Sequence, residues 1–192
     1  KLNIPGEEEL SGMGVSYCAT CDGAFFKNKT AVVVGGGNMA VEDAIFLSRI
    51  CRKVYLVHRR EELRAERILQ ENLFACENVE IRWNSVAVEI QGTEYVTGIK
   101  IRDVQDATES VIDTDGVFIA VGILPNTDKF RNLVKLDEAG YIVAGEEGIT
   151  ETPGIFAAGD IRTKMLRQVV TAVADGANAV ASVQNYLIHR RD

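Results

Sequence analysis

The feature that most restricts the fold is a glycine-rich turn between a short apolar run and a segment with helical periodicity. The apolar run covers residues 30–34, and the helical pattern covers residues 38–50. A buried strand, a glycine turn and a helix in this order predict the first β-α unit of a dinucleotide-binding domain. We expect Gly35 to form the tight turn, Gly37 to let the backbone approach a pyrophosphate, and Ala40 to bring the helix close to the strand. An alternative is a tight turn that binds no ligand. The residues expected to contact the nucleotide here are Gly35, Gly36, Gly37, Asn38, Met39 and Ala40.

The rest of the first 121 residues continues an α/β pattern. Between residues 85 and 112, apolar and polar side chains alternate with period two, which predicts an antiparallel β-meander with one solvated face. We therefore predict a Rossmann-like α/β domain in three layers (ββα), with a parallel sheet and this meander, over residues 1–121. Its other elements are predicted as strands at 53–57, 79–83 and 116–121 and a second helix at 61–74.

The pattern changes at both ends of this domain. Residues 1–10 contain Pro5 and Gly6 and are interpreted as a linker. Gly, Pro and Asn occur together between residues 122 and 126, which indicates a boundary. The segment 122–192 then predicts short strands at 141–143 and 155–158, a turn at Gly159 and Asp160, and a long helix at 166–187.

The end of the second strand predicts which nucleotide binds. An NAD site usually has Asp or Glu about 20 residues after the glycines, where it holds the ribose hydroxyls. Here that place reads His58-Arg59-Arg60, with Arg64 four residues further on. Guanidinium groups suit a 2′-phosphate, so the pattern favours NADPH over NADH. Arg60 and Arg64 share one helix face if the helix has begun. The alternative is a solvated basic face that binds nothing.

A second motif, Cys18-Ala-Thr-Cys21-Asp22, precedes the glycine turn. A gap of two residues lets two thiols reach disulfide distance, and it suits a redox couple. The Asp22 carboxyl can deliver or accept the proton that dithiol chemistry needs. Two alternatives are a zinc site, for which two further ligands of suitable spacing are missing, and a pair of buried structural thiols. Cys51 and Cys76 are interpreted as packing residues, and no metal is expected.

The composition excludes several classes of protein. The chain has 192 residues and a formal net charge of -7, which argues against a nucleic-acid partner. No apolar run approaches the roughly 20 residues of a membrane span, and the first residues lack the apolar core of a secretion signal. Four cysteines with one close pair do not form a secreted disulfide framework. We therefore expect a cytoplasmic protein without a membrane partner.

Four motifs in order resemble the low-molecular-weight, bacterial-type thioredoxin reductases, and the resemblance runs through essentially the whole chain. The motifs are Cys18 to Asp22, Gly35 to Asp43, His58 to Arg64, and Thr152 to Asp160 with Arg167 and Gln168. The family consists of homodimeric flavoenzymes that pass electrons from NADPH through FAD and the cysteine pair to thioredoxin. By this resemblance Cys21 faces the flavin, Cys18 attacks thioredoxin, and Asp22 handles the proton.

The resemblance also implies the positions that hold the cofactors. Arg59, Arg60 and Arg64 match the positions for the 2′-phosphate, and Glu42 matches an acidic residue near the nicotinamide. The remaining positions implied for cofactor binding are His58, Gly122, Gly159, Asp160, Arg167, Gln168 and Val169.

The sequence departs from the family in one large respect. The family begins with its own FAD-binding glycine fingerprint, whereas this chain has a single fingerprint. Residues 1–121 therefore correspond to the NADPH domain, and residues 122–192 correspond to the C-terminal half of the FAD domain. We expect weak FAD binding and low stability of residues 123–192 by themselves, because a half-sheet exposes edges and apolar faces. Two other functions stay open: an NADPH-binding module without turnover, and a relative with another donor or acceptor, such as ferredoxin or a peroxidase partner.

Overall fold

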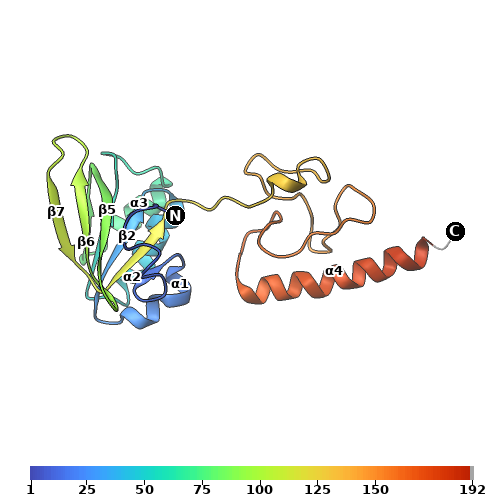
Figure 1. Ribbon diagram of the computed structural model, residues 1–192, viewed down its shortest axis with the longest axis horizontal. Helices are drawn as coiled ribbons and strands as arrows, with labels where there is room; N and C mark the ends of the chain where they lie inside the picture. Colours follow the sequence, from blue (N-terminus) through green and yellow to red (C-terminus); the bar gives the residue numbers. More distant parts are fainter. Residues whose placement is uncertain (191–192) are drawn as a thin grey trace. The chain divides into compact units, whose positions relative to one another are not determined.

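The computed structural model describes residues 1–190 and divides into two compact units (Figure 1). The first unit is Lys1–Gly122, and the second begins at Ile123. The expected boundary lies one residue earlier, between 121 and 122. Residues 191 and 192, the end of the predicted second segment, lie outside the described residues.

A parallel sheet forms the centre of the first unit. Residues 30–34 of its middle strand are all buried, as expected for a strand that is covered on both faces. Its five strands are, in spatial order, β1 (Val15–Ser16), β8 (Gly116–Ala120), β2 (Thr30–Gly35), β3 (Lys53–Val57) and β4 (Val79–Arg82).

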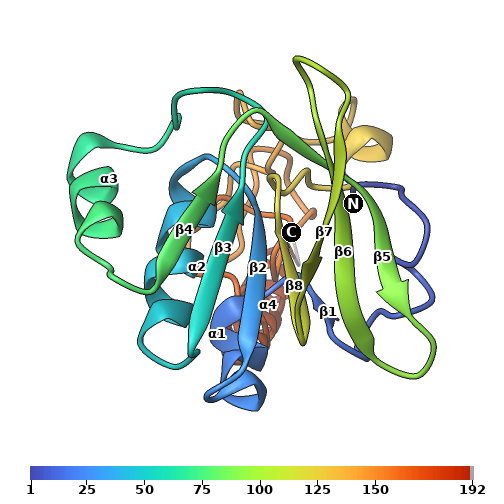
Figure 2. The same ribbon diagram turned by 90° about the vertical axis from the view of Figure 1, so that its left-hand side faces the viewer.

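Two different layers cover the faces of this sheet (Figure 2). One face packs against the helices through a core that includes Leu47, Leu56 and Phe118. The other face packs against an antiparallel sheet through Ile99 and Ile112, among others. The predicted α/β fold with three layers and a β-meander is confirmed. The helices are α1 (Ala19–Asp22), the 3-10 helix η1 (Gly23–Phe26), α2 (Asn38–Ser48) and α3 (Arg67–Phe74), and the meander strands are β5 (Ser85–Gly92), β6 (Val96–Asp103) and β7 (Glu109–Asp113).

The helix expected at 61–74 begins only at Arg67. Residues 58–66 instead form an irregular loop, and both Leu63 and Ala65 enter the core, whereas a helix would place side chains two residues apart on opposite sides. The condition for Arg60 and Arg64 to share a helix face, a helix that has already begun at these residues, is therefore not met.

The first ten residues also differ from the expected linker. Leu10 and the Glu7 carboxylate are buried, and Leu2 and Ile4 pack against the core beneath the meander. The Glu7 side chain accepts hydrogen bonds from the amides of Leu2 and Asn3, which fold the segment back on itself. These residues are therefore part of the first unit, because their apolar side chains gain burial there.

The second unit has a small core and one long helix. Its core contains Val134, Ile142, Ala144 and Ala157. The strands expected at 141–143 and 155–158 are absent among the described residues, and only isolated bridges occur there. The predicted helix starts later than residue 166, as α4 (Val169–His189), and a short 3-10 helix η2 (Asp128–Phe130) precedes it in the chain.

The start of α4 is fixed by a capping box. The Gln168 side chain accepts from the third helical residue, Thr171, whose hydroxyl in turn accepts from the Gln168 amide. This exchange satisfies amide donors at the helix end and explains the later start. Within residues 1–190, no helix is long and apolar enough to cross a membrane.

Candidate functional site

The two cysteines of the Cys-x-x-Cys motif form a disulfide at the start of α1. Cys18 takes the N-cap position, and its Sγ accepts a hydrogen bond from the Cys21 amide at 3.2 Å. A sulfur atom thus stands where an oxygen side chain usually caps a helix. Cys21 is exposed, which disagrees with the alternative of two buried structural thiols. The structure therefore places a disulfide where a reaction partner can reach it.

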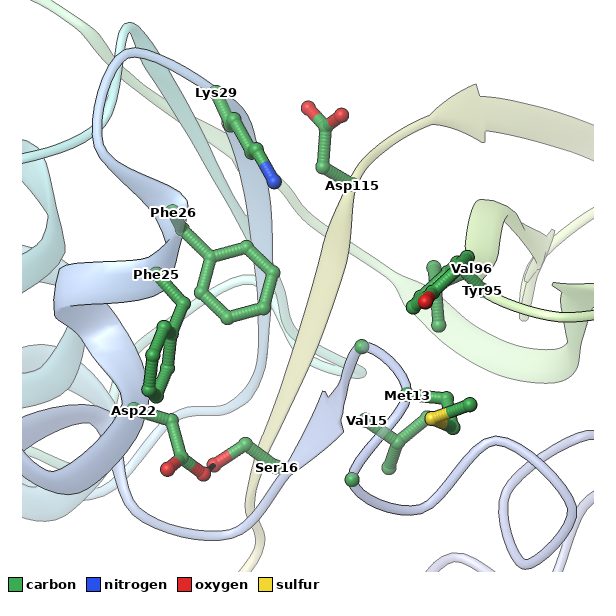
Figure 3. A pocket seen from close by; sticks show the side chains of 12 residues that line it. Met13, Val15, Ser16, Asp22, Phe25, Phe26, Lys29, Tyr95, Val96 and Asp115 are labelled. Carbon is green, nitrogen blue, oxygen red and sulfur yellow. Dashed lines mark hydrogen bonds between the residues drawn. The ribbon is translucent and has the colours of Figure 1, made fainter.

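The carboxylate after the disulfide is held by a serine that sequence reasoning missed. Ser16, the last residue of β1, donates from Oγ to Asp22 Oδ2 at 2.7 Å. Asp22 lines a cavity of about 310 Å³ together with Phe25 and Met13, whose side chains are labelled in Figure 3. The Phe25 ring is 73% exposed. The carboxyl group that follows the disulfide in the chain therefore lines one cavity with exposed apolar side chains.

The glycine turn between β2 and α2 has one closed side and one open side. A Cβ on Gly35 would approach Ala120 O to 2.4 Å and the Ala40 Cβ to 2.6 Å. A Cβ on Gly36 would meet the His58 ring at 2.1 Å, a contact that the spacing did not predict. A Cβ on Gly37 would have nothing within 4 Å. Gly35 and Gly36 therefore serve packing, whereas Gly37 leaves room for a ligand at the first turn of α2.

The loop of residues 58–66 folds over this turn. The Arg64 amide donates to Gly36 O at 2.7 Å. Asn38 and Glu66 exchange two hydrogen bonds of 2.9 Å, one from the Asn38 side-chain amide to the carboxylate and one from the Glu66 backbone to Asn38 Oδ1. Sequence reasoning missed this pairing, because the partners are 28 residues apart. The basic loop is thus tied to the start of α2.

Two of the three predicted arginines share a cavity with the glycine turn. Arg59 and Arg64 line a cavity of about 330 Å³ together with Gly35, Gly36 and His58. Arg60 is exposed and is not among the residues around this cavity. The cavity lies at the carboxyl ends of β2, β3 and β8, where ligands of open α/β sheets bind.

His58 acts as a support under the turn. It is 5% exposed, and its Nε2 lies 3.0 Å from Glu62 O. Burial lowers the pKa of the imidazole, although hydrogen bonds to Glu62 and Gly35 oppose the shift. A buried ring against Gly36 is consistent with a packing role at the edge of the cavity.

Two acidic residues of α2 follow the turn. Glu42, expected near a nicotinamide, is exposed. Burial raises the pKa of the neighbouring Asp43 to about 6, and the charge of Glu42 adds to the shift. The structure thus places an exposed carboxylate and a half-buried one on the second turn of the helix.

Comparison with known proteins agrees with these features. A family profile described as pyridine nucleotide-disulphide oxidoreductase matches residues 1–176. The chain belongs to the pyridine nucleotide-disulphide oxidoreductase family.

Named relatives within this oxidoreductase family are thioredoxin reductases. The chain is 54% identical over 188 residues to the thioredoxin reductase of Listeria monocytogenes, covering 97% of this chain and 59% of the relative. It is 50% identical to the thioredoxin reductase of Bacillus subtilis, with 97% and 60% covered. The crystal structure of thioredoxin reductase from Streptococcus pyogenes matches with a TM-score of 0.94 at 46% identity, over 98% of this chain and 62% of that one. The resemblance to bacterial-type thioredoxin reductases is confirmed, and the chain spans about three fifths of the length of these relatives.

The expected flavin-binding residues of the second unit lie in and next to one loop before α4. Arg167 stacks on the Tyr141 ring, 3.8 Å from its centroid, and its Nε donates to Asp160 O at 3.2 Å. Gly159 has a positive φ of 81°, which glycine adopts without strain. The Asp160 side chain is exposed, and Val169 at the start of α4 is 81% exposed.

A buried ion cluster holds this loop against α4. Asp175 is 4% exposed and accepts from the Gly159 amide and from Lys164 Nζ, both at 2.9 Å. It also accepts two bonds from the Arg162 guanidinium, which is the main reason that the Asp175 pKa lies well below its usual range. Sequence reasoning missed this cluster because its members come from separate segments.

The residues present fit the two cofactors that the family implies. Gly37 and the arginine-lined cavity leave space for a phosphorylated nucleotide. The exposed Asp160 carboxylate, in the loop before α4, suits hydrogen bonds from a hydroxylated chain. Gly122, the remaining position implied for cofactor binding, is exposed with a φ of 111°, and a Cβ there would meet nothing within 4 Å.

Proposed function

We propose that the chain belongs to an NADPH-dependent flavoprotein disulfide reductase that passes electrons from NADPH through FAD to the Cys18–Cys21 pair and on to thioredoxin. In this proposal, residues 1–121 bind NADPH and carry the dithiol, and residues 122–192 contribute part of the FAD site. When bound, the nicotinamide and the flavin supply the two electrons that reduce the disulfide.

The observation that carries the proposal is an accessible disulfide in the same unit as a glycine turn with room for a nucleotide. Cys21 is exposed, and its helix packs against the helix that follows the turn. A structural disulfide has no need of a nucleotide site beside it, whereas a redox couple needs a source of electrons.

The basic loop supports NADPH as the nucleotide. Arg59 and Arg64 line the cavity at the glycine turn, and no carboxylate stands at the end of β3. Two guanidinium groups can hold a 2′-phosphate through charge-assisted hydrogen bonds. The proposed roles of Arg60 and Glu42 in cofactor binding rest on the resemblance alone.

The chain's own residues then handle the sulfur chemistry. Cys18 is the proposed nucleophile toward the acceptor, and Cys21 is the thiol that closes the disulfide again. Asp22 accepts the proton of the attacking thiol and returns it to the leaving sulfur. The exposed Phe25 and Met13 beside this carboxylate provide an apolar contact for a protein acceptor such as thioredoxin.

A different electron donor is a second possibility. The chain matches the crystal structure of a ferredoxin-flavin thioredoxin reductase from Clostridium acetobutylicum with a TM-score of 0.52 at 29% identity. The arginine-lined cavity favours NADPH over that donor, because a protein donor leaves it without a ligand. The homodimer and the cytoplasmic location are further predictions of the resemblance.

The test is the visible absorption spectrum of the purified chain, followed by addition of NADPH without oxygen. A flavin band that bleaches with NADPH shows a working site, and Cys21→Ser should then abolish reduction of thioredoxin by NADPH. NADPH binding without a flavin band shows a nucleotide-binding module that carries the dithiol but does not reduce it. A chain that binds neither group contradicts the proposal.

A further inference from the structure

We propose that Ser16 is a positioning residue that holds the Asp22 carboxylate for its work on protons at the cysteine pair. This inference rests on the proposed function, in which Asp22 exchanges protons with the sulfur atoms. Ser16 ends β1 and is 5% exposed, so its hydroxyl has little access to water and bonds within the protein.

The Ser16 hydroxyl connects the acid to the backbone of the nucleophile. Its Oγ accepts from the Cys18 amide at 3.1 Å and donates to Asp22 Oδ2 at 2.7 Å. The Cys18 carbonyl lies 3.3 Å from the same Oγ, but a hydroxyl has one proton, and the closer, charged acceptor takes it. The bond between Ser16 and Asp22 is visible in Figure 3.

Among residues 1–190, the Asp22 side chain makes no hydrogen bond besides the one from Ser16. Asp22 stands at the N-cap position of η1, yet its side chain makes no capping bond there. Asp22 is also the last residue of α1, and its backbone is helical, with φ -111° and ψ -10°. Ser16 draws the Asp22 side chain toward the end of β1, and this orientation is what the serine contributes.

Several titratable groups surround the carboxylate. Lys29, Tyr95 and Asp115 line the same cavity from three other segments, and the Asp115 carboxylate accepts from the Thr30 amide. Tyr17 and the cysteine pair lie on the adjoining backbone. Among residues 1–190 no ion pair within 4.0 Å joins Asp22 to a cation, so the serine is its neutral donor.

The chemical step can be written with every proton accounted for. As the Cys18 sulfur attacks the acceptor disulfide, its proton passes to Asp22, a mixed disulfide forms, and the acceptor sulfur that leaves takes that proton. The Cys21 sulfur then attacks Cys18 Sγ, releases the second acceptor sulfur with its own proton, and restores the disulfide. Two electrons move from the pair to the acceptor. A hydrogen bond from Ser16 favours the ionised carboxylate that accepts the first proton.

The experiment measures this exchange directly, without nucleotide or flavin. The 192-residue chain is reduced with dithiothreitol, freed of it, and mixed without oxygen with oxidised bacterial thioredoxin. Acid quench and alkylation with a maleimide polymer then report thioredoxin reduction against time, from about pH 4 to about pH 9, the range that spans carboxyl and thiol titration. The variants are Ser16→Val and Ser16→Thr, which have nearly the same shape but differ in the hydroxyl. Ser16→Ala repeats the comparison with a smaller side chain in case the larger ones distort β1.

We expect Ser16→Val and Ser16→Ala to slow the exchange about three- to tenfold and to move the acid limb of the pH profile upward, because the carboxylate loses a hydrogen-bond donor. Ser16→Thr should keep the wild-type profile. The inference is overturned if Ser16→Val and Ser16→Thr slow the exchange equally and leave the acid limb of the pH profile unshifted. That result would show that Ser16 contributes packing alone.

A reference variant separates this inference from the function on which it rests. Asp22→Asn should slow the exchange and remove the acid limb. If it does so while Ser16→Val and Ser16→Ala match the wild type, the serine does not position the carboxylate. If Asp22→Asn itself leaves the exchange unchanged, the proposed role of Asp22 is wrong, and the inference about Ser16 fails with it.

Discussion

At the scale of single residues, neighbouring glycines of one turn have opposite surroundings. Gly36 is packed against the His58 ring, whereas the space in front of Gly37 is open. The sequence pattern predicts that every glycine of the turn contacts the nucleotide. Only the surrounding atoms show which glycine is packed against the protein and which has open space in front of it.

Substitutions at these two glycines should therefore have different consequences. Gly36→Ala forces the buried His58 ring to move and should lower the free energy of unfolding by about 1–3 kcal/mol. Gly37→Ser keeps a good N-cap residue and should change the free energy of unfolding by less than about 0.5 kcal/mol. The same substitution should weaken NADPH binding about tenfold. Urea denaturation and titration calorimetry measure the two effects. Unchanged NADPH affinity in Gly37→Ser would exclude a close approach of the nucleotide at this turn.

Asp43 predicts a pH dependence of stability. Its pKa in the folded chain is raised to about 6, chiefly by burial, whereas an unfolded chain has about 3.9. Between these values the folded state binds more protons, so this carboxyl stabilises the fold at low pH, and that contribution is lost as the pH rises through about 6. Asp43→Asn should therefore gain stability relative to wild type between about pH 4 and about pH 7 in urea denaturation. The control, Asp113→Asn on the exposed face of β7, should show no such gain.

At the scale of elements, the loop between β3 and α3 matters more than the helix that was expected there. Hydrogen bonds from Arg64 and Glu66 hold it on the glycine turn and the start of α2. The helix was predicted to begin at residue 61 because apolar side chains recur from there on. Apolar spacing alone does not distinguish a helix from an irregular loop whose side chains are also buried. Strand β2, the glycine turn and helix α2 were predictable, because the spacing of their apolar residues matches the residues that are buried.

The proposed binding of NADPH at this loop gives a testable prediction about nucleotide selectivity. Arg59→Ala and Arg64→Ala should each weaken NADPH binding about ten- to a hundredfold and change NADH binding much less, because only NADPH carries the 2′-phosphate. Arg67→Ala on α3 is the matched control, because its guanidinium is 92% exposed and pairs with Glu71. Equal losses for both nucleotides would show that the arginines do not contact the 2′-phosphate.

At the scale of the whole molecule, the two units differ in how much apolar surface they bury. The first unit has two cores on either side of its sheet. The second has a small core, and α4 leaves Val169, Val170 and Val173 between 67% and 81% exposed. Apolar side chains in such number on one helix mark a surface that lacks a covering layer.

Limited proteolysis of the 192-residue chain tests this difference. We expect cleavage within residues 123–192 well before any cleavage within 15–121, because opening of the second unit costs less free energy. Mass spectrometry of the fragments identifies the sites. Equal resistance of both segments would contradict the prediction of a poorly stable second unit.

The sequence by itself determined the α/β class, the strand–turn–helix at Gly35, the disulfide partners Cys18 and Cys21, and the family. Each depends on residue types at short spacings, which local backbone geometry and periodic burial translate directly into structure. The tertiary structure decided which arginines reach the glycine turn, that residues 1–10 pack into the first unit, and that Ser16 holds Asp22. Those contacts join segments whose sequences carry no joint pattern, and only the packed chain brings their hydrogen-bonding groups within reach of one another.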